Sequence, residues 1–173
     1  MQGTYQHSQL RYLTIAALFA AMVTVSILIF RIPVGNGIVH FGDAMIYLAA
    51  CFLPKKYALV AVSIGGVTAN LFAGLTMWAP ATAVIKPLIA VWFVNKGPIL
   101  TKWHVCALVI GGIVNTGLYY VYEALFIAGN WYTPFFTAMW GGAAQSGGSA
   151  VIFVMLAVIF DRMSLKNRLG MGS

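Results

Sequence analysis

The stretch Tyr12–Phe30 reads YLTIAALFAAMVTVSILIF and contains no charged residue. Its 19 residues match the roughly 20 that an α-helix needs to cross the hydrocarbon core of a bilayer. No small-residue cleavage site follows a short apolar core, so we interpret the stretch as a retained membrane helix and not as a signal peptide. This run predicts an integral membrane protein.

The composition of the whole chain agrees with that interpretation. Of its 173 residues 61% are apolar and 8% are charged, whereas about a quarter of a soluble domain is charged. Large soluble catalytic domains, nucleotide-binding domains and disulfide scaffolds are therefore excluded. The net charge of +7 does not indicate nucleic-acid binding, because the basic residues are scattered between apolar runs. Cys51 and Cys106 lack metal-ligand spacing, so we expect reduced thiols and no metal site.

Proline, glycine and lysine divide the rest of the chain into further apolar runs. The segment Arg31–Gly37 has loop composition, and Pro54 with two following lysines marks the next break. We predict an all-α integral membrane protein in which residues 1–173 form a single domain. Its six transmembrane helices are expected at about residues 10–30, 38–52, 57–72, 80–95, 103–127 and 135–160.

The distribution of lysine and arginine predicts the orientation. Six helices place both termini on one side of the membrane, and that side collects most of the basic residues, whereas the other has Arg31 alone. By the positive-inside rule, both termini are predicted to be cytoplasmic. The residues on that side are Arg11, Lys55, Lys56, Lys96, Lys102, Arg162, Lys166 and Arg168.

Three ionisable residues fall inside the predicted spans: Asp43, Lys86 and Glu123. Burying such a group in a bilayer costs at least about 2.5 kcal/mol, so each needs a partner or a purpose. Counted from the helix ends, all three are predicted to lie at one level in the outer part of the membrane. One interpretation is a ligand site, and the other is a structural ion pair of Lys86 with Asp43 or Glu123.

Other polar and aromatic residues are predicted at the same level. His40 precedes Asp43 by three residues, which would place both on one face of a helix, and Asn36 lies in the preceding loop. Aromatic walls with a few polar groups are typical of a small-molecule pocket, although many of these rings would also suit an interfacial belt. The predicted substrate-binding residues are Asn36, His40, Asp43, Trp78, Lys86, Tyr119, Glu123 and Trp140.

Small residues form a second pattern in the first span. Ala16 and Ala20 are four residues apart, as are Ala17 and Ala21, so they form a smooth ridge that another helix can approach closely. Catalytic and cofactor motifs such as HExxH, GxSxG and Walker A are missing, so we expect no enzyme activity and no cofactor.

The segment Asn36–Asp43, NGIVHFGD, continues as AMIYLAA to Ala50. This segment, with the six predicted helices and the alanine ridge, resembles the S component of an energy-coupling factor (ECF) vitamin transporter. The likeness extends over essentially the whole chain, and NGIVHFGD resembles the group assigned to hydroxymethylpyrimidine or pyridoxine uptake.

The resemblance implies a subunit in the plasma membrane of a prokaryote that captures a vitamin precursor outside the cell and has no ATPase activity of its own. It would dock through Ala16, Ala17, Ala20 and Ala21 on a transmembrane T component that is coupled to two cytoplasmic ATPases, and it would topple in the membrane. Two alternatives remain. One is a self-sufficient secondary transporter with Asp43 or Glu123 as a proton relay, and the other is a small membrane enzyme that uses His40 and Asp43.

Overall fold

The computed structural model describes residues 2–34 and 37–171, and these residues are mostly helical. The six longer helices among them run in the order in which the sequence predicts them. In chain order the elements are α1 (Gln2–Ile29), β1 (Arg31–Val34), β2 (Gly37–His40), α2 (Asp43–Phe52), α3 (Lys55–Phe72), η1 (Thr76–Trp78), α4 (Ala79–Ala90), α5 (Lys102–Phe126), α6 (Tyr132–Arg162) and α7 (Leu165–Arg168).

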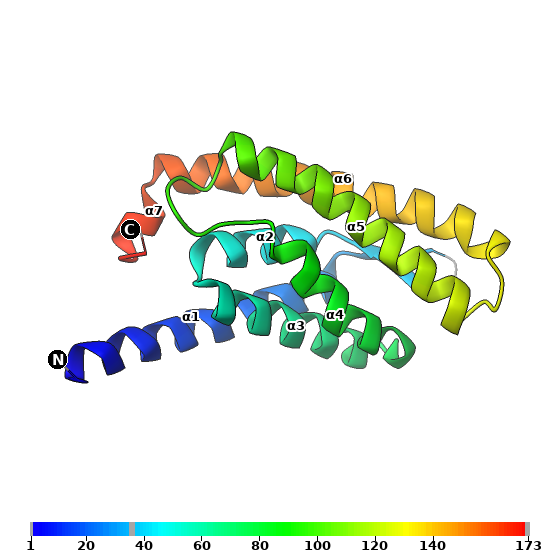
Figure 1. The fold of residues 1–173 in the computed structure, drawn as a ribbon, viewed down its shortest axis with the longest axis horizontal. Helices are drawn as coiled ribbons and strands as arrows, with labels where there is room; N and C mark the ends of the chain where they lie inside the picture. The colour runs from blue at the N-terminus through cyan, green and yellow to red at the C-terminus, as the bar shows by residue number, and fades with distance from the viewer. Residues whose placement is uncertain (1, 35–36, 172–173) are drawn as a thin grey trace.

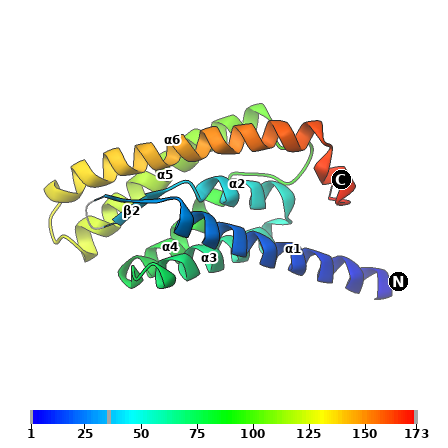
Figure 2. The same cartoon turned by 180° about the vertical axis from the view of Figure 1, so that it is seen from behind.

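The helices form an elongated bundle. Helices α5 and α6 lie side by side on one flank, α1, α3 and α4 lie on the other, and α2 runs between them (Figures 1 and 2). Both chain ends lie at the same end of the bundle, while the β1–β2 hairpin and the α5–α6 connection lie at the opposite end (Figure 2). The cavity described below opens at the hairpin end.

Three helices are long and apolar enough to cross a membrane within the described part of the chain. They are Gln9–Ile29 within α1, Lys102–Phe126 and Tyr132–Arg162. Helix α2 is much shorter than a span, with 10 residues, and α4 has 12. Side chains such as Phe72, Ile113 and Phe126 are more than two-thirds exposed, so the outer surface of the bundle suits contact with lipid or with another membrane protein.

The predicted second helix, residues 38–52, is wrong at its start. Residues 37–40 instead form β2, which pairs antiparallel with β1 so that Arg31 faces His40 and Ile32 faces Val39. The β-branched residues Ile32, Val34, Ile38 and Val39 favour this strand pairing over a helix. Helix α2 begins only at Asp43, so His40 and Asp43 do not share a helical face.

The predicted fourth helix, residues 80–95, also ends earlier than expected, at Ala90. The following main chain is held by side chains from other elements. The Val94 N–H donates to His104 Nε2 at 3.1 Å, and Lys166 Nζ donates to the Asn95 carbonyl at 2.7 Å. These long-range bonds replace the bonds that a further helical turn would have made.

Glycine allows the close approach of α3 to α1 and α4. A β-carbon at Gly65 would lie 2.6 Å from the Ala20 carbonyl oxygen, and one at Gly66 would lie 2.7 Å from the methyl group of Thr82. Any larger residue would therefore push α3 away from its two neighbours. Because Thr82 and Lys86 belong to the candidate site, this packing fixes the site as well as the fold.

Candidate functional site

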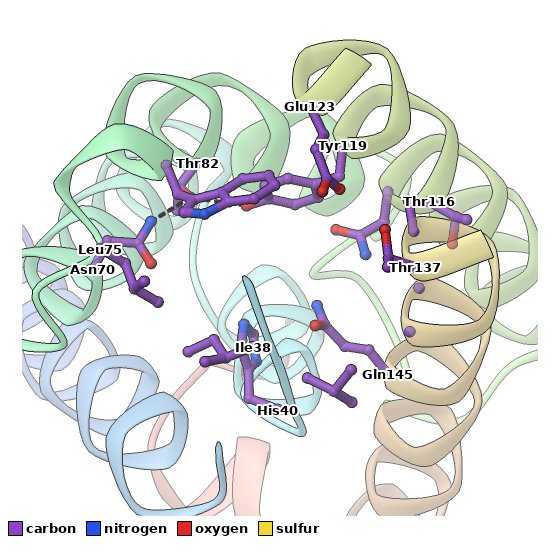
Figure 3. Close-up of a pocket in the computed structure, with 16 residues that line it drawn as sticks. Ile38, His40, Asn70, Leu75, Thr82, Thr116, Tyr119, Glu123, Thr137 and Gln145 are labelled. Carbon is purple, nitrogen blue, oxygen red and sulfur yellow. Dashed lines mark hydrogen bonds between the residues drawn. The ribbon is translucent and has the colours of Figure 1, made fainter. Parts of the chain in front are cut away.

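A cavity lies between the hairpin and the outer parts of α3, α4, α5 and α6. The volume that the centre of a water molecule can occupy in this cavity is about 90 Å³. About 10 to 15 Å³ measured in the same way is enough to hold one water, so the cavity suits a small molecule. Figure 3 shows Ile38, His40 and Gln145 on one side and Thr82, Tyr119 and Glu123 on the other. The remaining lining residues are Val39, Asn70, Leu75, Trp78, Asn115, Thr116, Thr137, Ala138, Gly141 and Gly142.

A fully buried ion pair lies next to this cavity. Lys86 Nζ on α4 is 2.7 Å from Asp43 Oδ1 on α2 and donates a second bond to Asn115 Oδ1 on α5 at 3.1 Å. Gln145 Nε2 on α6 donates to the other oxygen of Asp43 at 2.7 Å. Four helices are therefore joined through one carboxylate and one ammonium group. The pair is that of Lys86 with Asp43, one of the two pairings that the sequence allowed.

A second hydrogen-bonded chain runs along the opposite wall of the cavity. Asn70 Nδ2 donates to Thr82 Oγ1 at 2.6 Å, and Thr82 Oγ1 lies 2.8 Å from the Tyr119 hydroxyl (Figure 3). The Lys86 ammonium lies 5.1 Å from the centre of the Tyr119 ring, within the range of a cation–π contact. Tyr119 thus connects the cavity wall with the ion pair.

His40 lines the cavity from the end of β2. The backbone N–H of Gly42 donates to His40 Nδ1 at 3.2 Å, so a neutral ring carries its proton on Nε2. Burial lowers the pKa of His40 to about 4, while the Asp43 carboxylate acts in the opposite direction. The imidazole is therefore neutral at physiological pH and offers one N–H donor.

Glu123 and Trp78 complete the outer part of the cavity. Both are buried, with exposed fractions of 6% and 8%, and both line the cavity. The Trp78 ring lies 5.8 Å from that of Tyr119. Glu123 follows Asn115 by eight residues, which is about 12 Å along α5, so it does not share the level of Lys86. The prediction of one common level for the three charged residues is wrong for Glu123.

The structure separates the eight sequence-predicted site residues into groups. His40, Trp78, Tyr119 and Glu123 line the cavity, whereas Asp43 and Lys86 lie next to it and bind each other. Trp140 is 75% exposed and does not line it, because its position on α6 faces the outside of the bundle. Asn36 lies outside the described residues.

Sequence reasoning missed six lining residues that carry hydroxyl or amide groups: Asn70, Thr82, Asn115, Thr116, Thr137 and Gln145. A signal for them existed, because an uncharged polar side chain within an apolar helix also needs a partner in a membrane. The sequence did not show that these side chains line one space, since they come from four different helices.

The cavity lining is suited to binding and carries no recognisable catalytic arrangement. Amides and hydroxyls supply donors and acceptors, Glu123 supplies a carboxylate, and Trp78 and Tyr119 supply ring faces. Within residues 2–34 and 37–171, no three His, Cys, Asp or Glu side chains gather where they could hold a metal ion. The lining thus offers hydrogen-bond donors, hydrogen-bond acceptors and ring faces to a small molecule.

Comparison with known families agrees with such a site. The family described as "ECF-type riboflavin transporter, S component" matches residues 8–162, which is most of the chain. The chain belongs to this family. It is therefore a substrate-binding membrane subunit of the ECF type, and this membership is consistent with a transport role and not an enzymatic one. No curated protein and no solved structure matches the chain.

The alanine ridge of this S component has two sides. Ala17 and Ala21 are exposed on α1, whereas Ala16 and Ala20 are partly buried. The Ala20 carbonyl accepts a hydrogen bond from Thr24 at 2.9 Å and lies directly against Gly65 of α3. Only the Ala17 and Ala21 side of the ridge is therefore open to another protein.

Proposed function

We propose that this S component captures a small heteroaromatic vitamin or vitamin precursor for an ATP-driven ECF importer. The observation that carries the proposal is the cavity itself, in which the Glu123 carboxylate, the Trp78 and Tyr119 rings and a set of amides and hydroxyls line one small space. Hydroxymethylpyrimidine is our first candidate for the cargo, and pyridoxine is our second.

The lining complements an aminopyrimidine chemically. The Glu123 carboxylate is an acceptor for an exocyclic amine, and the neutral His40 ring offers an N–H to a ring nitrogen or a hydroxyl. The aromatic side chains offer faces for stacking. Each contact uses a group that is already buried, so a ligand gains well-oriented partners at little further cost in ordering.

Riboflavin is the competing cargo, because the family description names it. Riboflavin carries three fused rings and a polyhydroxylated chain, whereas hydroxymethylpyrimidine carries one ring. The cavity volume of about 90 Å³ favours the smaller molecule. If the hairpin or the α5–α6 connection moved outward, the larger cargo would have room.

We place both termini in the cytoplasm and all six longer helices in the membrane. The cavity then faces outward, because it is lined in part by the hairpin, which lies at the end of the bundle opposite to the termini (Figure 2). We further propose that Ala17 and Ala21 dock on the transmembrane T component, whose two ATPases supply the energy. The family membership and the exposure of these two alanines support this assignment.

The proton-relay alternative receives less support. Both oxygens of Asp43 already accept hydrogen bonds, one from Lys86 and one from Gln145. A carboxylate held in this way is stabilised in its ionised form and is a poor proton carrier.

The first test is mass spectrometry of small molecules released by denaturing the detergent-purified chain. It is followed by calorimetric titration with hydroxymethylpyrimidine, pyridoxine and riboflavin. We expect tight binding of one single-ring compound and weak binding of riboflavin. Tight riboflavin binding would overturn the single-ring assignment but keep the transport role, and binding of none of the three would overturn the cargo class.

Transport itself is tested in proteoliposomes. We expect uptake of the bound compound only when the T component and both ATPases are present with ATP. Uptake by the chain alone that depends on a proton gradient would instead support the secondary-transporter alternative.

A further inference from the structure

Two buried hydroxyl groups, those of Tyr47 and Ser149, lie one helical turn deeper in the bundle than the Asp43–Lys86 pair, and a third, that of Ser146, follows Gln145 directly on α6. The Tyr47, Ser146 and Ser149 oxygens are shielded from solvent, and within the described part of the chain none has a hydrogen-bond partner. Tyr47 and Ser149 are 0% exposed. A buried hydroxyl without a partner costs about 1 to 3 kcal/mol, so three in one region need an explanation.

Helix periodicity brings these groups together. Tyr47 follows Asp43 by four residues on α2, and Ser149 follows Gln145 by four residues on α6. Because Asp43 and Gln145 are hydrogen-bonded to each other, the residues one turn further along each helix also face each other at one level. This level lies about 6 Å below the ion pair.

At the same level, α5 carries a glycine, so no side chain of α5 fills the space there. The helix runs in the opposite direction, and Gly111 precedes the ion-pair partner Asn115 by four residues. A β-carbon at Gly111 would lie 3.8 Å from the Tyr47 hydroxyl, and one at Gly112 would lie 3.5 Å from Ser146 Oγ. The Tyr47 hydroxyl therefore lies beside Gly111, and the Ser146 hydroxyl lies beside Gly112.

We propose that Tyr47 and Ser149 bind an internal water molecule in this layer, below the ion pair and distinct from the ligand cavity. A buried water needs two to four polar partners, and each hydroxyl can both donate and accept. A cation fits the site poorly, because the hydroxyls are neutral and the nearby Asp43 charge is already balanced by Lys86. Ser146 supplies a third hydroxyl nearer to the level of the ion pair, next to Gly112 of α5.

The water would connect helices that no direct side-chain bond joins at this level. The Tyr47 ring packs between two other rings. It stacks on Phe93 at 4.7 Å and meets the edge of Phe153 at 5.8 Å, both measured between ring centres. A bridging water between α2 and α6 would fix the Tyr47 hydroxyl and thereby the helix that carries Asp43.

The direct test is X-ray hydroxyl-radical footprinting of the full chain in detergent micelles, with labelling read residue by residue by mass spectrometry. A bound water is activated in place, so we expect Tyr47 to be labelled in spite of its complete burial. Labelling should fall at least several-fold in Ser149→Ala. Absence of Tyr47 labelling in the wild-type chain, or labelling that Ser149→Ala leaves unchanged, would overturn the proposal.

Thermal unfolding gives a second, independent test. If a water joins the two hydroxyls, Tyr47→Phe and Ser149→Ala each lower the melting temperature, and the double variant falls little further than the larger single effect. If the hydroxyls have no partner at all, Tyr47→Phe leaves the melting temperature unchanged or raises it, and the proposal fails. Tyr12→Phe, at a partly exposed position on α1, is the matched control.

Discussion

The ring of Phe41 packs against Gly148, so a β-carbon on Gly148 would overlap that ring. Phe41 lies between the hairpin and α2, whereas Gly148 lies on α6, one turn beyond the residues that line the cavity. This contact lies next to the packing of β2 against α6, so it helps to hold the end of the hairpin that carries His40. A glycine here serves close approach and not an unusual backbone conformation.

Gly148→Ala is therefore expected to displace Phe41 and to loosen the hairpin over the cavity. We expect faster ligand dissociation and a lower affinity, measured by calorimetry or by a filter-binding assay. Gly147→Ala is the matched control, because a β-carbon at Gly147 meets no atom within 4 Å. Equal effects of the two substitutions would show that the Phe41 contact does not control the hairpin.

Glu123→Gln tests the carboxylate that lines the cavity. A hydrogen bond to a charged group contributes about 1.5 to 3 kcal/mol, so the affinity for an aminopyrimidine is expected to fall about 10- to 100-fold. The chain should fold normally, which its thermal unfolding would show. Trp140→Phe, at a position that is 75% exposed, should leave the affinity unchanged. Unchanged affinity in Glu123→Gln would remove Glu123 from the ligand site.

Breaking the Asp43–Lys86 pair is expected to act mainly on stability. Removing one partner leaves a buried charge without compensation, so Lys86→Met should lower the free energy of unfolding by about 3 to 5 kcal/mol. The double variant Asp43→Asn with Lys86→Met should be less destabilised than the sum of the two single variants. Unfolding in detergent measures all three, and additive effects would contradict direct coupling of the pair.

The pKa of His40 predicts a dependence of stability on pH. Because burial lowers that pKa to about 4 from its ordinary value of 6.5, the folded state favours the neutral ring. The stabilisation is complete above about pH 6.5 and is lost as the pH falls toward 4. The melting temperature of the wild-type chain should therefore fall more steeply over this range than that of His40→Gln. Parallel curves would contradict the assignment.

The two sides of the alanine ridge are expected to respond differently to enlargement. Ala17→Leu with Ala21→Leu should leave ligand binding and the melting temperature of the isolated chain intact, because both positions are exposed, but should abolish co-purification with the T component. Ala16→Leu with Ala20→Leu should destabilise the chain itself, since Ala20 packs against Gly65. Val25→Leu, also exposed on α1, is the control for added bulk.

Much of this S component could be predicted from its sequence. The uncharged run Tyr12–Phe30, the break at Pro54 and the low charge content predict a helical membrane protein, because a bilayer tolerates few other solutions. The cost of burying Asp43, Lys86 and Glu123 also drew attention to three residues that lie in or beside one cavity. Each of these inferences follows from a residue and its solvent, without knowledge of its neighbours.

Tertiary structure decided the rest. Lys86 binds Asp43 at 2.7 Å because α2 and α4 lie next to each other, whereas Glu123 lies further out along α5. Residues 37–40 form a strand because the strand Arg31–Val34 is available to pair with them, and Trp140 faces outward because of the rotation of α6. Hydrophobicity is a property of single residues and short runs, so the sequence determines that the chain enters a membrane. Which polar groups share one cavity depends on the packing of helices whose residues lie as far as about a hundred positions apart in the sequence. Only the folded chain specifies that packing.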